Sequence, residues 1–402
     1  MSQESVKEKN SADRYAALLS EAASIRGISL WKDAWRRLRK NYAAMTSLYF
    51  LGALVLLAWL TPLLPLQSPS FQLVNKENIY QRPRLLQRPL SISLADLKKF
   101  DAEVAELSAK ARAASGEEQK KLQSELQGKA RAHPFNRLWT TPGPLARLMI
   151  RTRLMIFGQW SIPSICGTDN LGRDVLSRIF WGARVSMMVG VLAAAVSLVI
   201  GVSYGAIAGY AGGIIDSGMM RGVDILYCIP FIFVVINLIM LLSDDEIKAS
   251  LARFGINQIM IFYIVIGAVY WLTMSRVVRG QVISLKHEQF IDAARTIGAG
   301  SGRIVFRHIV PNVLGIVIVY LTLTIPSVML FEAFLSFLGL GVQPPDVSWG
   351  MLVNEGIKVI TPIGIHWWLV LFPGLALALT LFALNFLGDG LRDALDPRMK
   401  NR

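Results

Sequence analysis

The sequence has few charged residues for its length. Only 17% of its 402 residues are Asp, Glu, Lys or Arg, whereas 53% are hydrophobic. Soluble domains carry about a quarter charged residues, so this chain lacks the polar side chains that would cover a soluble enzyme. The net charge is +14, but a basic protein that binds nucleic acid needs a charged surface, and this chain has too few polar residues to form one. We therefore expect no nucleic-acid partner.

Residues for several kinds of chemistry are also scarce. The two cysteines, Cys166 in a polar run and Cys228 in an apolar one, are expected to be unpaired thiols. No His-Glu-x-x-His or paired Cys-x-x-Cys pattern occurs, so we expect no metal site of those types. No P-loop sequence occurs, so we expect no nucleotide or other cofactor in this chain. The polar start MSQESVKEKN predicts no cleavable signal peptide.

Long apolar runs are abundant instead. Six stretches could form transmembrane helices, at residues 45–66, 184–209, 225–242, 259–275, 313–335 and 368–387. Their polarity does not alternate, which argues against strands. The sequence therefore predicts an all-α, polytopic membrane protein with six transmembrane helices.

Lys and Arg in the flanking segments predict the orientation. Nine lie in residues 1–44, five in 279–312 and four in 389–402, against two in 243–258 and one in 336–367. Because cytoplasmic loops are enriched in these residues, both termini are predicted to be cytoplasmic.

This topology divides the chain into five parts. They are a cytoplasmic segment (1–44), the first transmembrane helix (45–66), a long extracytoplasmic insert (67–183), a core of five transmembrane helices (184–388) and a cytoplasmic tail (389–402). Residues 91–131 of the insert are predicted to form a helical hairpin that starts at Ser93 and Asp96. Residues 29–41 and 168–181 read as amphipathic helices in the inner and outer membrane interfaces.

Residues 279–312 form the longest predicted cytoplasmic loop between spans. A short helix there should end at Gly298, because glycine tolerates the positive φ of a helix C-cap. The small residues Ala293 and Ala294 would let another surface approach this helix closely.

The loop resembles a known family. Asp292-Ala293-Ala294-x3-Gly298-x12-Pro311 is similar to the EAA loop of ABC importer permeases, with Asp292 in place of the usual Glu and His308 in place of an aliphatic residue. Further matching motifs are GTDNLGRD at 167–174, RHIVPN at 307–312, FLSFLGLG at 334–341 and GDGLRDALDP at 388–397. In this order they resemble the C-type permease subunit of dipeptide/oligopeptide importers over residues 28–66 and 160–398.

The resemblance implies a type I ABC importer permease fold and a non-catalytic subunit in a bacterial inner membrane. It implies a second homologous permease, two cytoplasmic ATPase subunits that bind ATP and Mg, and an extracytoplasmic peptide-binding protein as partners, within membrane lipid. It assigns coupling to the ATPase to the EAA residues, which are Asp292, Ala293, Ala294, Arg295, Ile297 and Gly298.

Polar residues inside apolar runs are costly in lipid and tend to face a cavity or the bundle interior. Glu332, Asn237 and Asn385 are such residues and are candidates for the translocation pathway. For Glu332, a place in the peptide path and a structural carboxylate held by hydrogen bonds weigh equally. Pro230, Pro326 and Pro373 also lie in these runs, where we favour packing over gating.

Three alternatives remain. A permease of the same architecture could import nickel or an antimicrobial peptide. A secondary transporter would need a relay of intramembrane acids, and only Glu332 stands out. An intramembrane serine protease is suggested by Gly201-Val-Ser-Tyr-Gly205, but all four histidines lie outside the apolar runs. Gly201, Gly205 and Gly209 fit close helix packing better.

Overall fold

The computed structural model describes residues 30–74, 78–85, 93–114, 117–131, 133–139, 143–242, 244, 246–247, 250, 258–344, 346–362 and 364–395. Over these residues the chain is helical, with two isolated β-bridges and no strand. The all-α prediction is confirmed. Residues 1–29, 86–92 and 396–402 lie outside the described residues. Most of the predicted cytoplasmic N-terminal segment, the start of the predicted hairpin and the end of the predicted cytoplasmic tail fall in these ranges.

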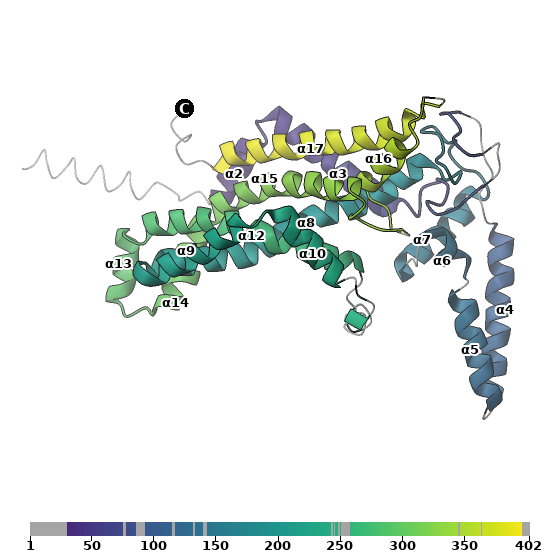
Figure 1. Ribbon diagram of the computed structural model, residues 1–402, viewed down its shortest axis with the longest axis horizontal. Helices are drawn as coiled ribbons and strands as arrows, with labels where there is room; N and C mark the ends of the chain where they lie inside the picture. Colours follow the sequence, from purple (N-terminus) through teal and green to yellow (C-terminus); the bar gives the residue numbers. More distant parts are fainter. Residues whose placement is uncertain are drawn as a thin grey trace, which may run out of the picture.

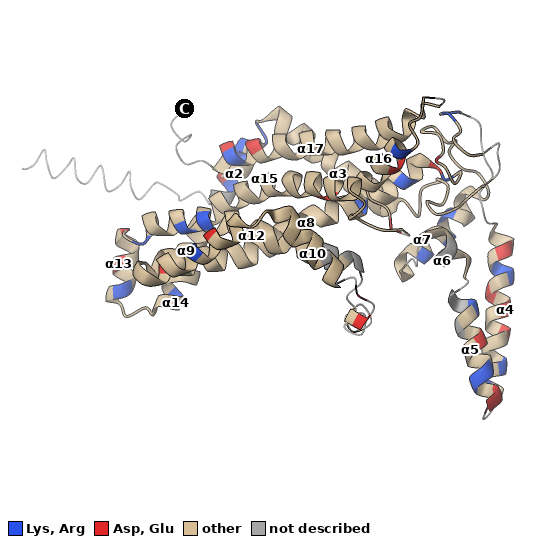
Figure 2. Ribbon diagram, viewed as in Figure 1, with Lys and Arg blue, Asp and Glu red and all other residues tan. Residues whose placement is uncertain are grey.

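Long helices lie side by side in one elongated bundle (Figure 1). Within the part of the chain that the structure describes, four helical segments are long and apolar enough to cross a membrane. They are α3 (Tyr42–Leu60), α8 (Val175–Ala211), the continuous helical run Ser301–Phe337, and α17 (Trp368–Leu395). The run Ser301–Phe337 consists of α14 (Ser301–Arg303), the π-helical turn η1 (Ile304–Ile309) and α15 (Val310–Phe337). Their middle parts carry few charges, which gather at the two ends of the bundle (Figure 2).

The predicted third span, 225–242, is not a single helix. It is divided between α9 (Gly213–Cys228) and α10 (Phe231–Leu242), which are bent by 83° at the break. Proline disfavours the helical conformation of the residue before it, and Ile229 before Pro230 is extended. Pro326 and Pro373 stay inside continuous helices. If the bent pair is counted as one span the total is five, and six spans remain a prediction.

The prediction of an outer interfacial helix at residues 168–181 is wrong. Residues 168–174 form a loop closed by a bridge between Thr168 and Asp174, and α8 begins at Val175. Asp174 caps α8 by accepting hydrogen bonds from the Ser177 backbone N–H (2.8 Å) and hydroxyl (2.7 Å). No proline interrupts the chain from there to Ala211, so the first turns and the apolar run form one helix of 37 residues.

The glycines of α8 pack against α12 (Gln258–Leu285), the helix that contains the predicted fourth span. A Cβ at Gly205 would lie 2.3 Å from the Ser275 carbonyl oxygen, and one at Gly209 would lie 2.9 Å from that of Arg279. At Gly201 a Cβ would meet Met274 at 2.6 Å. The prediction that these glycines serve close helix packing is confirmed.

Smaller helices cover both ends of the bundle. At one end α2 (Leu30–Leu38) buries Ala34 and Leu38 against Ala44 and Ala394. At the other end lie α6 (Pro134–Trp139), α7 (Pro144–Phe157) and α16 (Trp349–Lys358). The predicted hairpin appears as α4 (Leu94–Ala113) and α5 (Glu117–Arg131), which project beyond that end. The Ser93–Asp96 capping box that the sequence predicted is present.

Candidate functional site

The predicted coupling residues lie on α13 (Gln289–Thr296) and in the turn that follows it, at the end of the bundle opposite α16 (Figure 1). The turn is a Schellman motif, because the Ala299 N–H donates to the Ala294 carbonyl (3.0 Å) and the Gly298 N–H donates to that of Arg295 (2.9 Å). Gly298 has φ +83°, which glycine adopts without strain. We call residues 289–299 the elbow.

One face of the elbow is anchored and the rest is exposed. Ile291 and Ala294 are buried in a cluster that includes Val282, Ile304 and Ile309. The other predicted coupling residues are exposed, namely Asp292, Ala293, Arg295, Ile297 and Gly298. Ile297 is 86% exposed, and the nearby side chains of Phe290 and Phe306 are 41% and 55% exposed. The elbow is a short helix and turn whose exposed surface is partly apolar.

Contacts of charged side chains connect the elbow region to the bundle. The Arg295 guanidinium lies 5.7 Å from the ring centre of Tyr210 near the end of α8. Lys286 donates to the Gly209 carbonyl at 3.2 Å. Arg279 of α12 makes two hydrogen bonds, of 2.5 and 2.6 Å, to Asp216 of α9. The end of α8 is therefore in contact with both the elbow and the helix that precedes it.

The three candidate pathway residues lie on different helices. Glu332 on α15 is fully buried and accepts hydrogen bonds from the hydroxyls of Ser336 (2.8 Å) and Ser186 (3.5 Å). Asn237 on α10 donates to the Phe233 carbonyl of its own helix (2.9 Å) and is exposed, as is Asn385 on α17. The contacts of Glu332 match the structural alternative, and a pathway role for all three residues stays a prediction.

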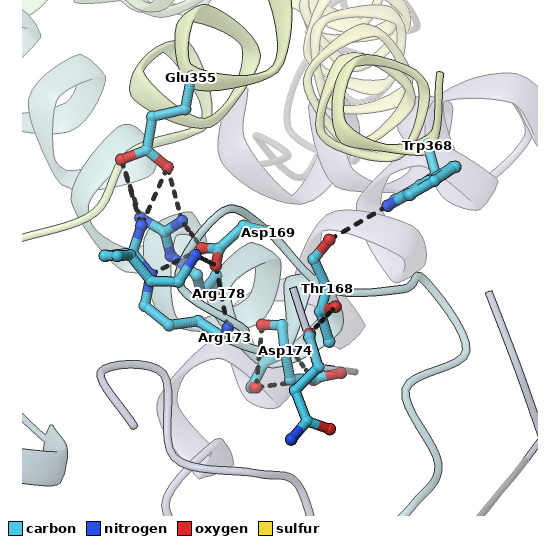
Figure 3. Close-up of polar contacts among 10 residues, drawn as sticks. Thr168, Asp169, Arg173, Asp174, Arg178, Glu355 and Trp368 are labelled. Carbon is cyan, nitrogen blue, oxygen red and sulfur yellow. Dashed lines mark hydrogen bonds and ion pairs between the residues drawn. The ribbon is translucent and has the colours of Figure 1, made fainter. Parts of the chain in front are cut away.

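A second constellation lies at the α16 end (Figure 3). Arg178 is 1% exposed and donates to Asp169 (2.5 Å) and Glu355 (2.6 Å). Arg173 donates to the same two carboxylates, at 2.7 and 3.4 Å. We call these four residues the ionic cluster. Its two positive and two negative charges balance, as burial of charge requires.

The ionic cluster closes a junction between distant segments. The Asp169 carboxylate also accepts from the backbone N–H groups of Leu171 and Arg173, both at 2.9 Å. Thr168 donates to the Asn78 carbonyl (2.8 Å), and Trp368 at the start of α17 donates to the Thr168 carbonyl (3.3 Å). The loop therefore joins residues near 80, the start of α8, α16 and α17.

Two glycines make this junction possible. Gly167 and Gly172 have φ of +76° and +69°. A Cβ at Gly172 would lie 2.3 Å from the Leu73 carbonyl oxygen, and one at Gly167 would lie 2.6 Å from that of Gln81. Both positions need a residue without a side chain, for the backbone angle and for the close approach.

Burial and charge shift several pKa values near this end. Burial and the negative charge of Asp169 raise the pKa of Tyr80, whose ring stacks on His366 with centroids 4.2 Å apart. Burial lowers the pKa of Arg153 to about 10 and raises that of Cys166 to about 12. Both cysteines are free thiols, as predicted. The described residues contain no group of three or more His, Cys, Asp and Glu suited to a metal ion.

Sequence reasoning missed the ionic cluster. The expected interfacial helix at 168–181 contains Asp169, Arg173 and Arg178 but gives no reason to pair them, and Glu355 lies in no expected motif. The closely spaced charges of both signs in GTDNLGRD, the motif at 167–174, were the available signal. The partner on α16 lies 177 residues from Arg178, and no pattern in the sequence pairs them.

The chain belongs to the family described as binding-protein-dependent transport system inner membrane component, which matches residues 201–401. Residues 29–86 match the N-terminal transmembrane domain of oligopeptide transport permease C. The predicted family membership is confirmed. Neither match includes residues 87–200, where the hairpin lies.

Curated relatives agree with this membership. The dipeptide transport system permease protein DppC of Bacillus subtilis is 45% identical over 234 residues, which are 58% of this chain and 68% of the relative. The oligopeptide transport system permease proteins OppC of Haemophilus influenzae and Escherichia coli are each 49% identical over 232 residues, which are 58% of this chain and 70% and 72% of those proteins. A solved structure, the inward-facing MetNI methionine ABC transporter, is similar with a TM-score of 0.42 and 18% identity over 55% of this chain and 96% of that one.

Proposed function

We propose that this chain is the permease subunit of an ATP-driven importer of peptides. In this proposal it forms half of the translocation pathway, and a second homologous permease forms the other half. Two cytoplasmic ATPase subunits bind ATP and Mg, and an extracytoplasmic binding protein delivers the peptide. Support for peptides as the solute comes from the relatives, which are named as dipeptide and oligopeptide permeases.

The observation that carries the coupling proposal is the form of the elbow. A helix that is packed against the bundle on one face, through Ile291 and Ala294, and exposed on the other can be bound by a separate protein and moved as a unit. The exposed side chains of Ile297, Phe290 and Phe306 supply apolar surface for that binding. The ATPase would bind here and pass its movement to the bundle through the contacts at Tyr210 and Gly209.

The test is a pair of matched substitutions, Gly298→Val and Gly300→Val, in the complete complex. Nothing lies within 4 Å of a Cβ at either position, but Gly298 has φ +83° and Gly300 has φ −68°. A β-branched residue is an outlier at positive φ, so only Gly298→Val should deform the turn. We expect this variant to hydrolyse ATP without peptide uptake, whereas Gly300→Val transports normally.

Peptide uptake and ATP hydrolysis are measured together in proteoliposomes. Normal uptake by Gly298→Val would contradict a coupling role for the elbow. Uptake driven by an ion gradient without an ATPase partner would instead favour a secondary transporter. Uptake of nickel or an antimicrobial peptide in place of dipeptides or oligopeptides would keep the architecture and change the substrate.

A further inference from the structure

The helix α7 has two apolar faces. One face is buried, with Ile150 at 1% and Leu154 at 3% exposed. The opposite face carries four large apolar side chains that are 61–69% exposed, which are Leu145 (61%), Leu148 (62%), Ile156 (65%) and Met155 (69%). A helix at a protein–water surface needs only one apolar face, so the exposed face requires a second apolar environment.

The position of α7 in the fold is fixed beside the end of α3. The Arg153 guanidinium donates to the Leu66 carbonyl, Ile162 N–H donates to the Pro65 carbonyl (2.7 Å), and Gln67 donates to Ser161 (3.0 Å). In each contact the partner from residues 65–67 lies only a few positions after Leu60, the last residue of α3. Ala58 of α3 belongs to the same buried cluster as Ile150 and Leu154.

That end of α3 is the end of a helix that could cross a membrane. α3 is one of the helices able to span, and it is 19 residues long, which is about 28 Å at 1.5 Å per residue and so close to the thickness of the apolar core. Exposed tryptophans lie next to three helix ends: Trp59 (54%) before the end of α3, Trp160 (45%) after α7 and Trp367 (48%) before the start of α17. Tryptophan is enriched at membrane–water interfaces.

The stretch of sequence that contains α7 carries charge of one sign, and Arg151 of α7 pairs with Asp101 of α4. Residues 126–168 contain six Lys or Arg and no Asp or Glu. Arg147 and Arg151 lie along one edge of the exposed apolar face, on the helical positions between it and the buried face. Basic residues beside an apolar helix face, with tryptophan nearby, are the chemistry that binds the boundary between acyl chains and lipid phosphates.

We propose that α7 is a membrane-interfacial helix whose Leu145, Leu148, Met155 and Ile156 insert into the lipid leaflet at the α16 end of the bundle. It takes the place that the sequence assigned to residues 168–181. The occupant of the exposed face is phospholipid, because α7 lies beside the end of α3, a helix able to span a membrane, and the face is bordered by Arg147 and Arg151. The insert is thereby held to the membrane surface, and the α4–α5 hairpin, which contacts α7 through the Arg151–Asp101 ion pair (2.7 Å), is held with it.

The experiment measures lipid contact in the complete complex reconstituted into phosphatidylethanolamine/phosphatidylglycerol nanodiscs. Cys228→Ser removes the exposed native thiol, and Cys166 stays because it is buried. A single cysteine then replaces Leu148 and is labelled with an environment-sensitive fluorophore. Phospholipids that carry a spin label near the headgroup or near the chain end serve as quenchers of known depth.

We expect the label at position 148 to emit at short wavelength and to lose more emission with the shallow spin label than with the deep one. Phe50→Cys, near the middle of α3 and 38% exposed, should show the reverse order. Ser124→Cys on α5 should be quenched by neither lipid. Met155→Cys repeats the measurement if the complex with Leu148→Cys does not assemble.

A label at positions 148 and 155 that behaves like that at 124 would overturn the proposal, because the face would then be in water. Short-wavelength emission without lipid quenching would also overturn it, because a protein such as the second permease would then cover the face. Peptide-stimulated ATP hydrolysis, measured on the same sample, reports on the proposed function separately. Loss of that stimulation with normal quenching would contradict the importer role and leave the interfacial helix intact.

Discussion

At the α13 end of the bundle, the residues that make the elbow are neighbours in the sequence, and its turn is closed by hydrogen bonds spanning three to five residues. At the α16 end, the residues that meet come from segments far apart, such as Arg178 with Glu355 and Thr168 with Trp368, which are 177 and 200 residues apart. One end presents a locally built, exposed helix. The other end is closed by buried ion pairs and long-range hydrogen bonds.

The difference teaches how stability is distributed. The ion pair on the elbow, Asp292 with Arg295, has side chains that are 63% and 45% exposed, whereas Arg178 and Asp169 are 1% and 5% exposed. Exposed pairs contribute little to stability, and removing one partner of a buried pair is costly. We therefore expect the α16 end to determine the stability of the fold, and the α13 end to determine which proteins bind it.

The largest expected effect on stability is at Arg178. Arg178→Met leaves two carboxylates, the buried Asp169 and Glu355, with the single cation Arg173, which should lower the free energy of unfolding by about 3–5 kcal/mol. The measurement is thermal unfolding of the purified complex in detergent. The matched control is Arg276→Met, whose ion pair with Asp224 is exposed (45% and 62%) and which should change little. Equal unfolding temperatures for both variants would contradict the comparison.

A pair of glycine substitutions compares the two ends directly. Gly298→Ala adds only the cost of a side chain at positive φ, about 1–2 kcal/mol, because its Cβ meets open space. Gly172→Ala adds the same cost and also places a Cβ 2.3 Å from the Leu73 carbonyl. We expect Gly172→Ala to lower the unfolding temperature further and to speed hydrogen exchange at the Leu73 and Tyr80 amides. If Gly298→Ala proved the more destabilising, the α16 end would not be the tighter junction.

A smaller effect on stability is expected on the elbow surface. Asp292→Ala should change the free energy of unfolding by less than about 0.5 kcal/mol, because Asp292 and Arg295 are exposed. The same variant should reduce co-purification of the ATPase. Unfolding and pull-down are measured on one preparation, with Glu288→Ala as the neighbouring control. A strongly destabilised protein would show that the elbow is part of the structural core.

The smallest effect on ATPase docking is expected from the hairpin. Deletion of residues 91–131 removes α4 and α5, which lie at the end of the bundle opposite the elbow (Figure 1). ATPase co-purification should therefore be unchanged. Loss of the ATPase from the purified deletion variant would show that the two ends of the molecule depend on each other more than their separation indicates.

The sequence could predict what local patterns encode. The elbow depends on Gly298 and the small residues before it, the hairpin on Ser93 and Asp96, and the α8–α12 contact on glycines four residues apart, and all three are present. Long-range pairing is not encoded locally, so the meeting of Arg178 with Glu355 was missed. The start of α8 was misplaced because a hydropathy window ends where charges begin, whereas the helix begins at its cap, Asp174.

The unbroken length of α8 connects the two ends of the molecule. Its 37 residues correspond to a rod of about 56 Å, nearly twice the apolar depth of a bilayer. Its first turns hold Arg178 in the ionic cluster, and its last turn meets Lys286 and Arg295 beside the elbow. Since no proline interrupts this helix, we expect that a tilt imposed on α8 beside the elbow would also move its first turns, which hold the ionic cluster at the opposite end.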